Sequence, residues 1–193
     1  MVFVIWSPKG GSGVSVLSAA TALAGARRGA GRIADLAGDQ PAVLALSSEP
    51  ETGLADWLEI GPEAPTEALD ALALEVGRGL SVLPLGARAA DPSWGGEGAS
   101  GAALAVALRS GSRSGVTVVD AGVPTRPALR AIVEVADASV VVLRGCYLAL
   151  RRATRDPLVE HAAGIALVEE PGRALGAGEV SDVLGKPVLA RVP

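Results

Sequence analysis

The stretch of the chain best suited to chemistry is glycine-rich and runs from Ser7 to Ser15, with the sequence Ser-Pro-Lys-Gly-Gly-Ser-Gly-Val-Ser. Glycines let the backbone approach an oxygen atom closely, because they carry no Cβ. Backbone N–H groups in such a turn, together with the N-terminus of a following helix, converge on phosphate. We therefore expect a phosphate cradle made by Lys9, Gly10, Gly11, Ser12, Gly13 and Ser15.

Apolar segments flank this turn on both sides. Residues 2–6 form a short apolar run typical of a buried strand, and residues 16–24 place small apolar residues at helical spacing. Strand, glycine turn and helix in this order are the context of a P-loop. The alternative is an ordinary glycine turn after a strand.

The turn departs from the general P-loop pattern, G-x-x-x-x-G-K-[ST], at two positions. Pro8 stands in place of the first glycine, and Val14 stands where a lysine would contact the phosphates. Ser15 keeps the hydroxyl that would hold Mg²⁺. Lys9 and Lys186 are the only lysines among 17 lysine and arginine residues, so composition does not explain a lysine at position 9.

The run Lys9-Gly10-Gly11 with its following glycine and serine resembles the deviant Walker A loop, K-G-G-x-G-K-[ST], of the MinD/ParA family, especially its CpaE/TadZ-like branch. This resemblance covers nearly the whole chain. It implies an α/β P-loop domain with a parallel sheet and helices on both faces. It also implies ATP or ADP with Mg²⁺ as cofactor, bound weakly or not at all here. In this family the lysine matching Lys9 contacts the nucleotide of the partner subunit in a sandwich dimer, which implies a catalytic role for it.

Two acidic residues at predicted strand ends match further motifs of this family. Asp35, in the strand expected at 32–36, matches the first acid of a D-x-D motif, a catalytic position. Ala37 stands in place of the second acid, which positions the attacking water. Asp120 ends a strand expected at 115–120, where a carboxylate would hold the water shell of Mg²⁺ across from Ser15. The alternative for this residue is a strand-end cap.

Asp39 is open to two interpretations. It could be the N-cap of a short helix that has Pro41 just inside its start and runs through residues 42–46. It could instead replace the acid missing at Ala37, provided that the backbone bulges between them.

Strands and helices alternate along the rest of the chain, which requires a parallel sheet with right-handed crossovers. We expect helices at 52–58, 66–76, 102–108, 147–155 and 179–184, and a further helix that opens at Pro127. We expect strands at 80–86, 138–143, 164–168 and 187–192. Residues 87–99 are expected to form a mobile loop, in which Trp94 is either an anchor or an exposed contact residue.

The composition fits a single globular domain, residues 1–193, with 49% hydrophobic and 20% charged residues. The net charge of −4 gives no overall attraction to nucleic acid or anionic lipid. A single cysteine excludes an internal disulfide and fits a reducing cytoplasm. No run of about 18 apolar residues is present, so we expect no transmembrane segment. The family continues beyond the Val-Pro that matches residues 192–193, so we expect the family's C-terminal segment to be lacking.

The missing lysine at Val14 and the missing acid at Ala37 predict weak or absent ATP hydrolysis. We expect a degenerate MinD/ParA-like scaffold that marks a cell pole, septum or pilus assembly site through protein partners, with a homodimer as a further option. In the cytoplasm, such partners would recruit it to a pole or membrane. The alternative is an active partition or localisation ATPase that uses Lys9. Three arginines on the helix expected at 147–155 form either a solvated face or a weak DNA-binding patch.

Overall fold

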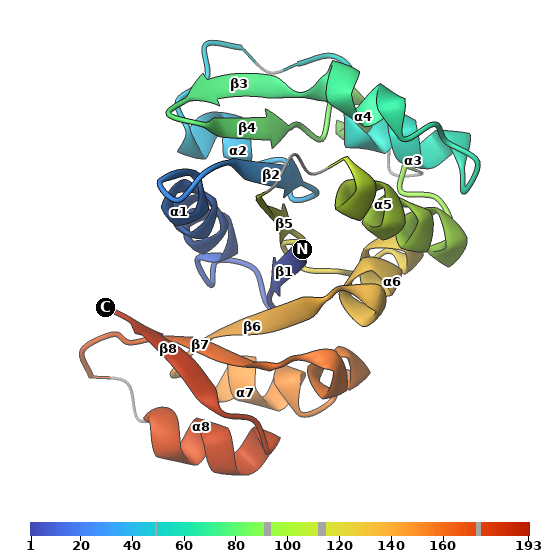
Figure 1. Cartoon of the computed structure of the whole chain (residues 1–193). Helices are drawn as coiled ribbons and strands as arrows, with labels where there is room; N and C mark the ends of the chain where they lie inside the picture. The colour runs from blue at the N-terminus through green and yellow to red at the C-terminus, as the bar shows by residue number, and fades with distance from the viewer. Residues whose placement is uncertain (49, 91–93, 112–114, 173–174) are drawn as a thin grey trace.

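A computed structural model describes the chain from Met1 to Pro193, apart from residues 49, 91–93, 112–114 and 173–174. The described residues form one eight-stranded sheet with the order β3-β4-β2-β5-β1-β6-β7-β8 (Figure 1). The strands are β1 (Val2–Trp6), β2 (Gly31–Asp35), β3 (Leu74–Gly77), β4 (Leu80–Leu83), β5 (Val116–Asp120), β6 (Ala138–Arg144), β7 (Gly164–Val168) and β8 (Val188–Val192). All neighbouring strands pair in parallel except β3 and β4, so the predicted parallel sheet is confirmed with one antiparallel edge strand.

Helices cover both faces of this sheet. On one face, α1 (Val14–Ala26) packs its small side chains against the central strands. The other face is covered by α3 (Leu54–Ile60), α4 (Glu67–Leu72), α5 (Gly98–Ser110), α6 (Pro127–Val135), α7 (Tyr147–Ala153) and α8 (Ala177–Leu184). Three short elements complete the described structure: α2 (Gln40–Val43), η1 (Ala87–Ala90) and η2 (Pro157–His161). None of the helices in the described part of the chain is long and apolar enough to span a bilayer.

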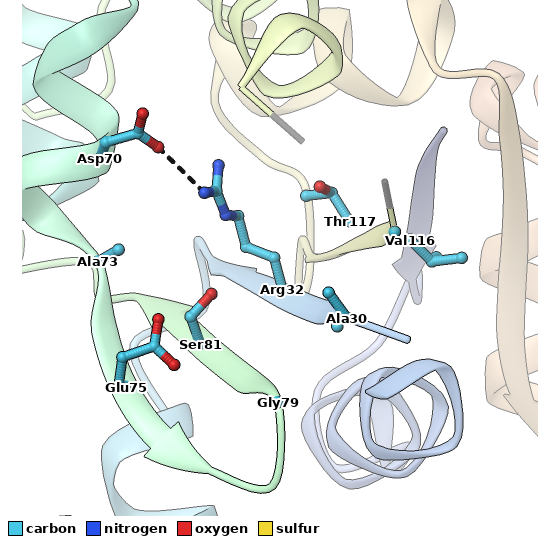
Figure 2. Close-up of a pocket in the computed structure, with 11 residues that line it drawn as sticks. Ala30, Arg32, Asp70, Ala73, Glu75, Gly79, Ser81, Val116 and Thr117 are labelled. Carbon is cyan, nitrogen blue, oxygen red and sulfur yellow. Dashed lines mark hydrogen bonds and ion pairs between the residues drawn. The ribbon is translucent and has the colours of Figure 1, made fainter. Parts of the chain in front are cut away.

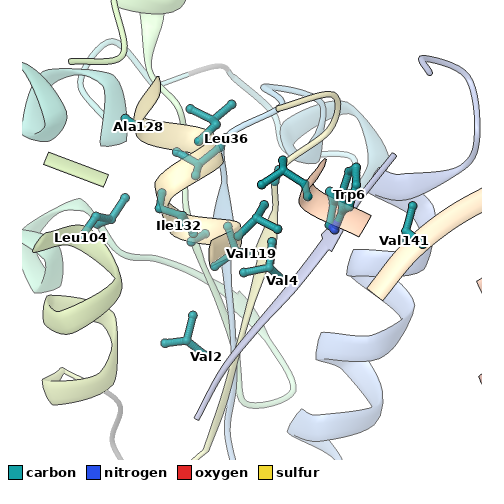
Figure 3. Close-up of a cluster of buried hydrophobic side chains, with 14 of the residues drawn as sticks. Val2, Val4, Trp6, Leu36, Leu104, Val119, Ala128, Ile132 and Val141 are labelled. Carbon is teal, nitrogen blue, oxygen red and sulfur yellow. The ribbon is translucent and has the colours of Figure 1, made fainter. Parts of the chain in front are cut away.

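The central strands are buried on both faces, which explains why their sequences are nearly continuous apolar runs. Val4 and Val119, from neighbouring strands, are both fully buried, as is Trp6 at the end of β1. Figure 3 shows these side chains gathered with Leu104 and Ile132 from the helices of the same face. The chain has few aromatic residues, but its three tryptophans all lie in this core among aliphatic side chains.

The helix predicted at 66–76 is wrong in its second half. Helix α4 ends at Leu72, and the chain then enters β3, which pairs antiparallel with β4. Gly77, Arg78 and Gly79 all have positive φ, at +98°, +57° and +76°. Two glycines within three residues make this tight reversal accessible. The Leu-Glu-Val segment before them therefore extends along the sheet edge instead of continuing the helix.

Other boundaries also differ from the predictions. The strand expected at 80–86 ends at Leu83, and α5 begins at Gly98, several residues before the helix expected at 102–108. The loop predicted at 87–99 begins with the short helix η1, and its residues 91–93 lie outside the described part.

The strand order brings the predicted site residues to one edge of the sheet. Strand β5 lies between β1 and β2, so the glycine turn after β1 adjoins the ends of both acidic strands. In the register of the sheet, Asp35 is directly opposite Asp120, which is in turn opposite Ile5. The carboxyl edge of a parallel sheet is where open α/β folds bind ligands.

Candidate functional site

The glycine turn has the backbone shape of an anion cradle. Gly11 and Gly13 adopt φ values of +73° and +90°, a left-handed conformation that residues with a Cβ rarely take. Gly13 is the N-cap of α1, so the positive end of a 13-residue helix points at the turn. The structure thus places the predicted cradle residues together at the start of α1.

Two serines fix the shape of the turn from inside. The Ser7 hydroxyl donates to Ser12 Oγ at 2.9 Å, and the Ser12 hydroxyl donates to the Lys9 carbonyl at 2.8 Å. The Lys9 N–H donates back to Ser7 Oγ at 3.3 Å, which closes the ring. Both serines are buried, so the Ser12 hydroxyl serves the loop, and its backbone is the part that remains for a ligand.

The Lys9 side chain lies at the mouth of the turn. Its Nζ donates to the Gly10 carbonyl at 3.2 Å and is solvent-exposed. Contact with the nucleotide of a second subunit stays a prediction.

Asp35 holds the turn that follows β2. Its Oδ1 accepts the backbone N–H groups of Ala37 and Gly38 at 3.1 and 2.7 Å, and its Oδ2 accepts that of Gln40 at 3.0 Å. Burial, with the neighbouring Asp120 carboxylate, raises the pKa of Asp35 to about 7, although the N–H groups oppose this shift. The carboxyl group is fully buried and is not part of the cleft wall described below. Its catalytic role stays a prediction.

Asp120 lies at the carboxyl end of β5, as predicted. Its Oδ1 accepts the Gly122 N–H at 3.2 Å, and its Oδ2 accepts Nε2 of Gln40 at 2.7 Å. Burial raises the pKa of Asp120, against the effect of the Gln40 and Ser15 hydrogen bonds. Sequence reasoning missed Gln40, because a glutamine before Pro41 carries no local signal for a contact so distant in sequence.

The structure bears on both interpretations of Asp39. Asp39 is the N-cap of α2 by position, but its carboxylate makes no capping hydrogen bond. Gly38, at φ +84°, turns the backbone so that Asp39 Oδ2 accepts the Ser15 hydroxyl at 3.3 Å. This turn brings an acid to the cradle two residues after Ala37.

The cradle forms one wall of a cleft of about 550 Å³. The lining of this cleft includes Val14, Ala37 and Asp39 near the glycine turn, and Trp94 and Arg126 from later parts of the chain. Trp94 is 6% exposed, which favours the loop anchor over the exposed contact residue. The Arg126 guanidinium stacks over its ring at 4.5 Å from the centroid and donates to its backbone carbonyl at 2.8 Å.

No protein-family model matches the chain, and no curated protein matches it. Among solved structures, it resembles the ParA family ATPase from Chlorobium tepidum TLS, with a TM-score of 0.76 and 22% identity over 100% of this chain and 83% of that chain. For the MinC:MinD cell division protein complex of Aquifex aeolicus, the TM-score is 0.73 and the sequence identity is 22%, over 100% of this chain and 81% of that chain. For the septum site-determining protein MinD of Pyrococcus horikoshii OT3, complexed with Mg-ADP, the TM-score is 0.74 and the sequence identity is 17%, over 100% of this chain and 80% of that chain.

The fold is that of the MinD/ParA P-loop proteins. At these identities the likeness establishes the architecture alone. The eight-stranded, mostly parallel sheet with its flanking helices is the feature that the comparison covers.

The MinD/ParA fold implies Mg²⁺ with the nucleotide, and the residues near Ser15 fit this ion in donor type. The Ser15 hydroxyl and the carboxylates of Asp39 and Asp120 are hard oxygen donors of the kind that Mg²⁺ prefers. When bound, the ion would neutralise charge on the β- and γ-phosphates. Within the described ranges, no three His, Cys, Asp or Glu residues gather as a metal site of their own. Nucleotide oxygens and water would have to supply the remaining ligands.

A second cavity, of about 360 Å³, lies at the opposite edge of the MinD/ParA-type sheet. Figure 2 shows Arg32 reaching across it toward Asp70, with which it forms an ion pair at 3.0 Å. Ser81 and Thr117 flank Arg32 in the strand register, at the amino ends of β4 and β5. Ligands of open α/β sheets bind at the carboxyl ends of strands, so this cavity is separate from the cradle.

Proposed function

We propose that this chain is a degenerate MinD/ParA-like positioning or scaffold protein of the CpaE/TadZ-like branch. It binds ATP or ADP with Mg²⁺ weakly and hydrolyses ATP slowly or not at all. The observation that carries this proposal is a glycine turn with left-handed Gly11 and Gly13, beside a cleft that has Val14 and Ala37 at the two positions where charged groups would act.

The energetic effect of Val14 follows from its side chain. A charge-assisted hydrogen bond contributes about 1.5–3 kcal/mol, so the missing lysine lowers phosphate affinity by roughly one to two orders of magnitude. Val14, the first residue of α1, is buried in the apolar cluster between this helix and the sheet. The backbone N–H groups and the helix dipole remain, which supports weak binding.

Slow or absent ATP hydrolysis is expected from the placement of the acidic residues near the cradle. Ala37 cannot accept a hydrogen bond from an attacking water, and the Asp35 carboxyl is held by three backbone N–H groups. Asp39 is the carboxylate that does line the cleft, at hydrogen-bond distance from Ser15. This placement favours the second candidate, an active partition or localisation ATPase in which Lys9 and Asp39 take over the missing roles.

Action through protein partners is the second part of the proposal. The Aquifex MinD occurs in a complex with MinC, which supports a protein partner at a pole, septum or pilus site for this chain. Tyr147 and Leu148, at the start of α7, are 74% and 45% exposed and offer apolar contact area. Arg151 and Arg152 on the same helix are exposed, but the net charge of −4 disfavours DNA as the main partner.

Isothermal titration calorimetry with Mg·ATP tests the proposal, and phosphate release measures turnover. The wild-type chain should bind with a Kd far above about 1 µM and release phosphate at the rate of a protein-free blank. Gly13→Val is the control, because a β-branched residue at φ +90° distorts the cradle and should abolish the remaining binding. A Kd of about 1 µM together with steady turnover would contradict the degenerate site and favour the ATPase.

A further inference from the structure

We propose that Arg126 supplies, from a second part of the cleft wall, the positive charge that Val14 does not provide, and that it binds the terminal phosphates of a polyphosphate ligand. This inference rests on the proposed nucleotide-binding function and assigns a further binding residue to that site. It makes the second wall of the cleft part of the phosphate site.

Contacts with Trp94 hold the Arg126 side chain in place. Its guanidinium stacks on the Trp94 ring at 4.5 Å, and its Nη1 donates to the Trp94 carbonyl at 2.8 Å. Gly95 makes room for it, because a Cβ there would lie 2.7 Å from Arg126 Cδ. A side chain fixed in this way loses little rotamer freedom on binding, which favours affinity.

The backbone that carries Arg126 is tied directly to the glycine turn. The residue follows the end of β5 and is the N-cap of α6, and β5 is the neighbour of β1 in the sheet. The Ser7 N–H, at the start of the glycine turn, donates to the Gly122 carbonyl in the loop that leads to Arg126, at 2.9 Å. Both walls therefore form one connected unit around the cleft.

The charges that line the cleft favour an anion. Lys9 and Arg126 are the cations of its described wall, and Asp39 is the acid. The buried Asp35 and Asp120 carboxyl groups lie behind this wall. The N-terminus of α1 adds the positive end of the helix dipole at the place where phosphate would lie. Arginine suits the role because its planar fork can contact two phosphate oxygens at once.

Calorimetric titration of the full chain with inorganic triphosphate and with ATP tests the proposal, both in the absence of Mg²⁺. Arg126→Gln should lower the affinity for both ligands by roughly 10- to 100-fold, and Arg126→Lys should lose less. Arg28→Gln, which removes an exposed charge beyond the far end of α1, is the matched control and should leave the affinity unchanged. Adding Val14→Lys to Arg126→Gln should restore most of the lost affinity, because it returns a cation to the same phosphates.

The outcomes separate this inference from the proposed function. Equal affinities of Arg126→Gln and Arg28→Gln, with thermal unfolding unchanged, would overturn the role of Arg126. A failure of Val14→Lys to restore binding in the Arg126→Gln background would also overturn it, since the loss would then be structural. Brisk ATP hydrolysis by the wild type would overturn the degenerate site while leaving the Arg126 comparison valid. Absence of binding of triphosphate and ATP to the wild type would overturn the role of Arg126, and absence of Mg·ATP binding as well would overturn the proposed nucleotide binding.

Discussion

Gln40 Nε2 donates a 2.7 Å hydrogen bond to Asp120 Oδ2, although the two residues are 80 positions apart in sequence, and both side chains are fully buried. The same amide nitrogen donates to the Ser15 carbonyl at 2.9 Å. Gln40 Oε1 has no hydrogen-bond partner within the part of the chain that the structure covers. One side chain thus connects the carboxylate of β5, the start of α1 and the turn after β2.

Gln40→Ala should destabilise the protein by about 1–3 kcal/mol, because it leaves the Asp120 oxygen buried without its donor. Urea unfolding in the presence of a chelator measures this loss. Added Mg²⁺ should recover more stability in the variant than in the wild type, since the freed carboxylate oxygen can then bind a cation or its water. Arg28→Gln, a substitution at an exposed position, serves as the control. Equal Mg²⁺ effects on both proteins would show that Asp120 does not face the ion.

Val14→Lys should raise ATP affinity by about one to two orders of magnitude, because an ammonium returns to an intact cradle. Turnover should stay near background, since Ala37 still cannot orient water, and Val14→Lys with Ala37→Asp should be the combination that hydrolyses ATP. Calorimetry and phosphate release check the two effects separately. Brisk turnover by the single variant would identify Asp39, beside Ser15, as the group that positions water.

Lys9→Ala should weaken ATP-dependent self-association while leaving the fold intact, if the lysine contacts the nucleotide of a second subunit. Sedimentation velocity with and without ATP measures the association. Lys186→Ala is the matched control, since this lysine donates to the Glu160 carbonyl, far from the cradle in the sheet order. A dimer that forms without ATP and is unchanged by Lys9→Ala would refute the sandwich role.

The stability of the protein should fall as the pH rises from about 4 to about 7. Asp35 has a pKa of about 7 in the folded protein against an ordinary value of 3.8, so the folded chain binds more protons in this range than the unfolded chain. Its favourable contribution is therefore present at low pH and is lost as the carboxyl ionises. Urea unfolding in a chelator at several pH values measures the slope. Asp35→Asn should flatten that slope, whatever it does to stability at a single pH, and an unchanged slope would contradict the assignment.

Local sequence was sufficient to predict the glycine turn, the strand-end acids and their meeting at one edge. Each depends on a short motif, and a parallel sheet brings the carboxyl ends of neighbouring strands together. The positions of Gln40 and Arg126 depend on contacts that no local pattern encodes. Asp39 reaches the cleft because Gly38 takes a left-handed turn, which the sequence permits without requiring.

The edge strand β3 was missed for a related reason. Its Leu-Glu-Val run continues the helical pattern of α4, and the reversal at Gly77, Arg78 and Gly79 decides against the helix. Pairing with β4 then supplies the backbone hydrogen bonds that a longer helix would have made. Tertiary pairing outweighed local propensity at this point.

The ring of hydrogen bonds among Ser7, Lys9 and Ser12 gives the glycine turn its shape without help from a ligand. A loop that is already ordered has little left to change when phosphate arrives, and a ligand shifts a conformational balance only by its difference in affinity for two states. We therefore expect phosphate to leave the backbone of this turn unchanged, so that a response to ATP, such as self-association, would come from side chains at its mouth such as Lys9.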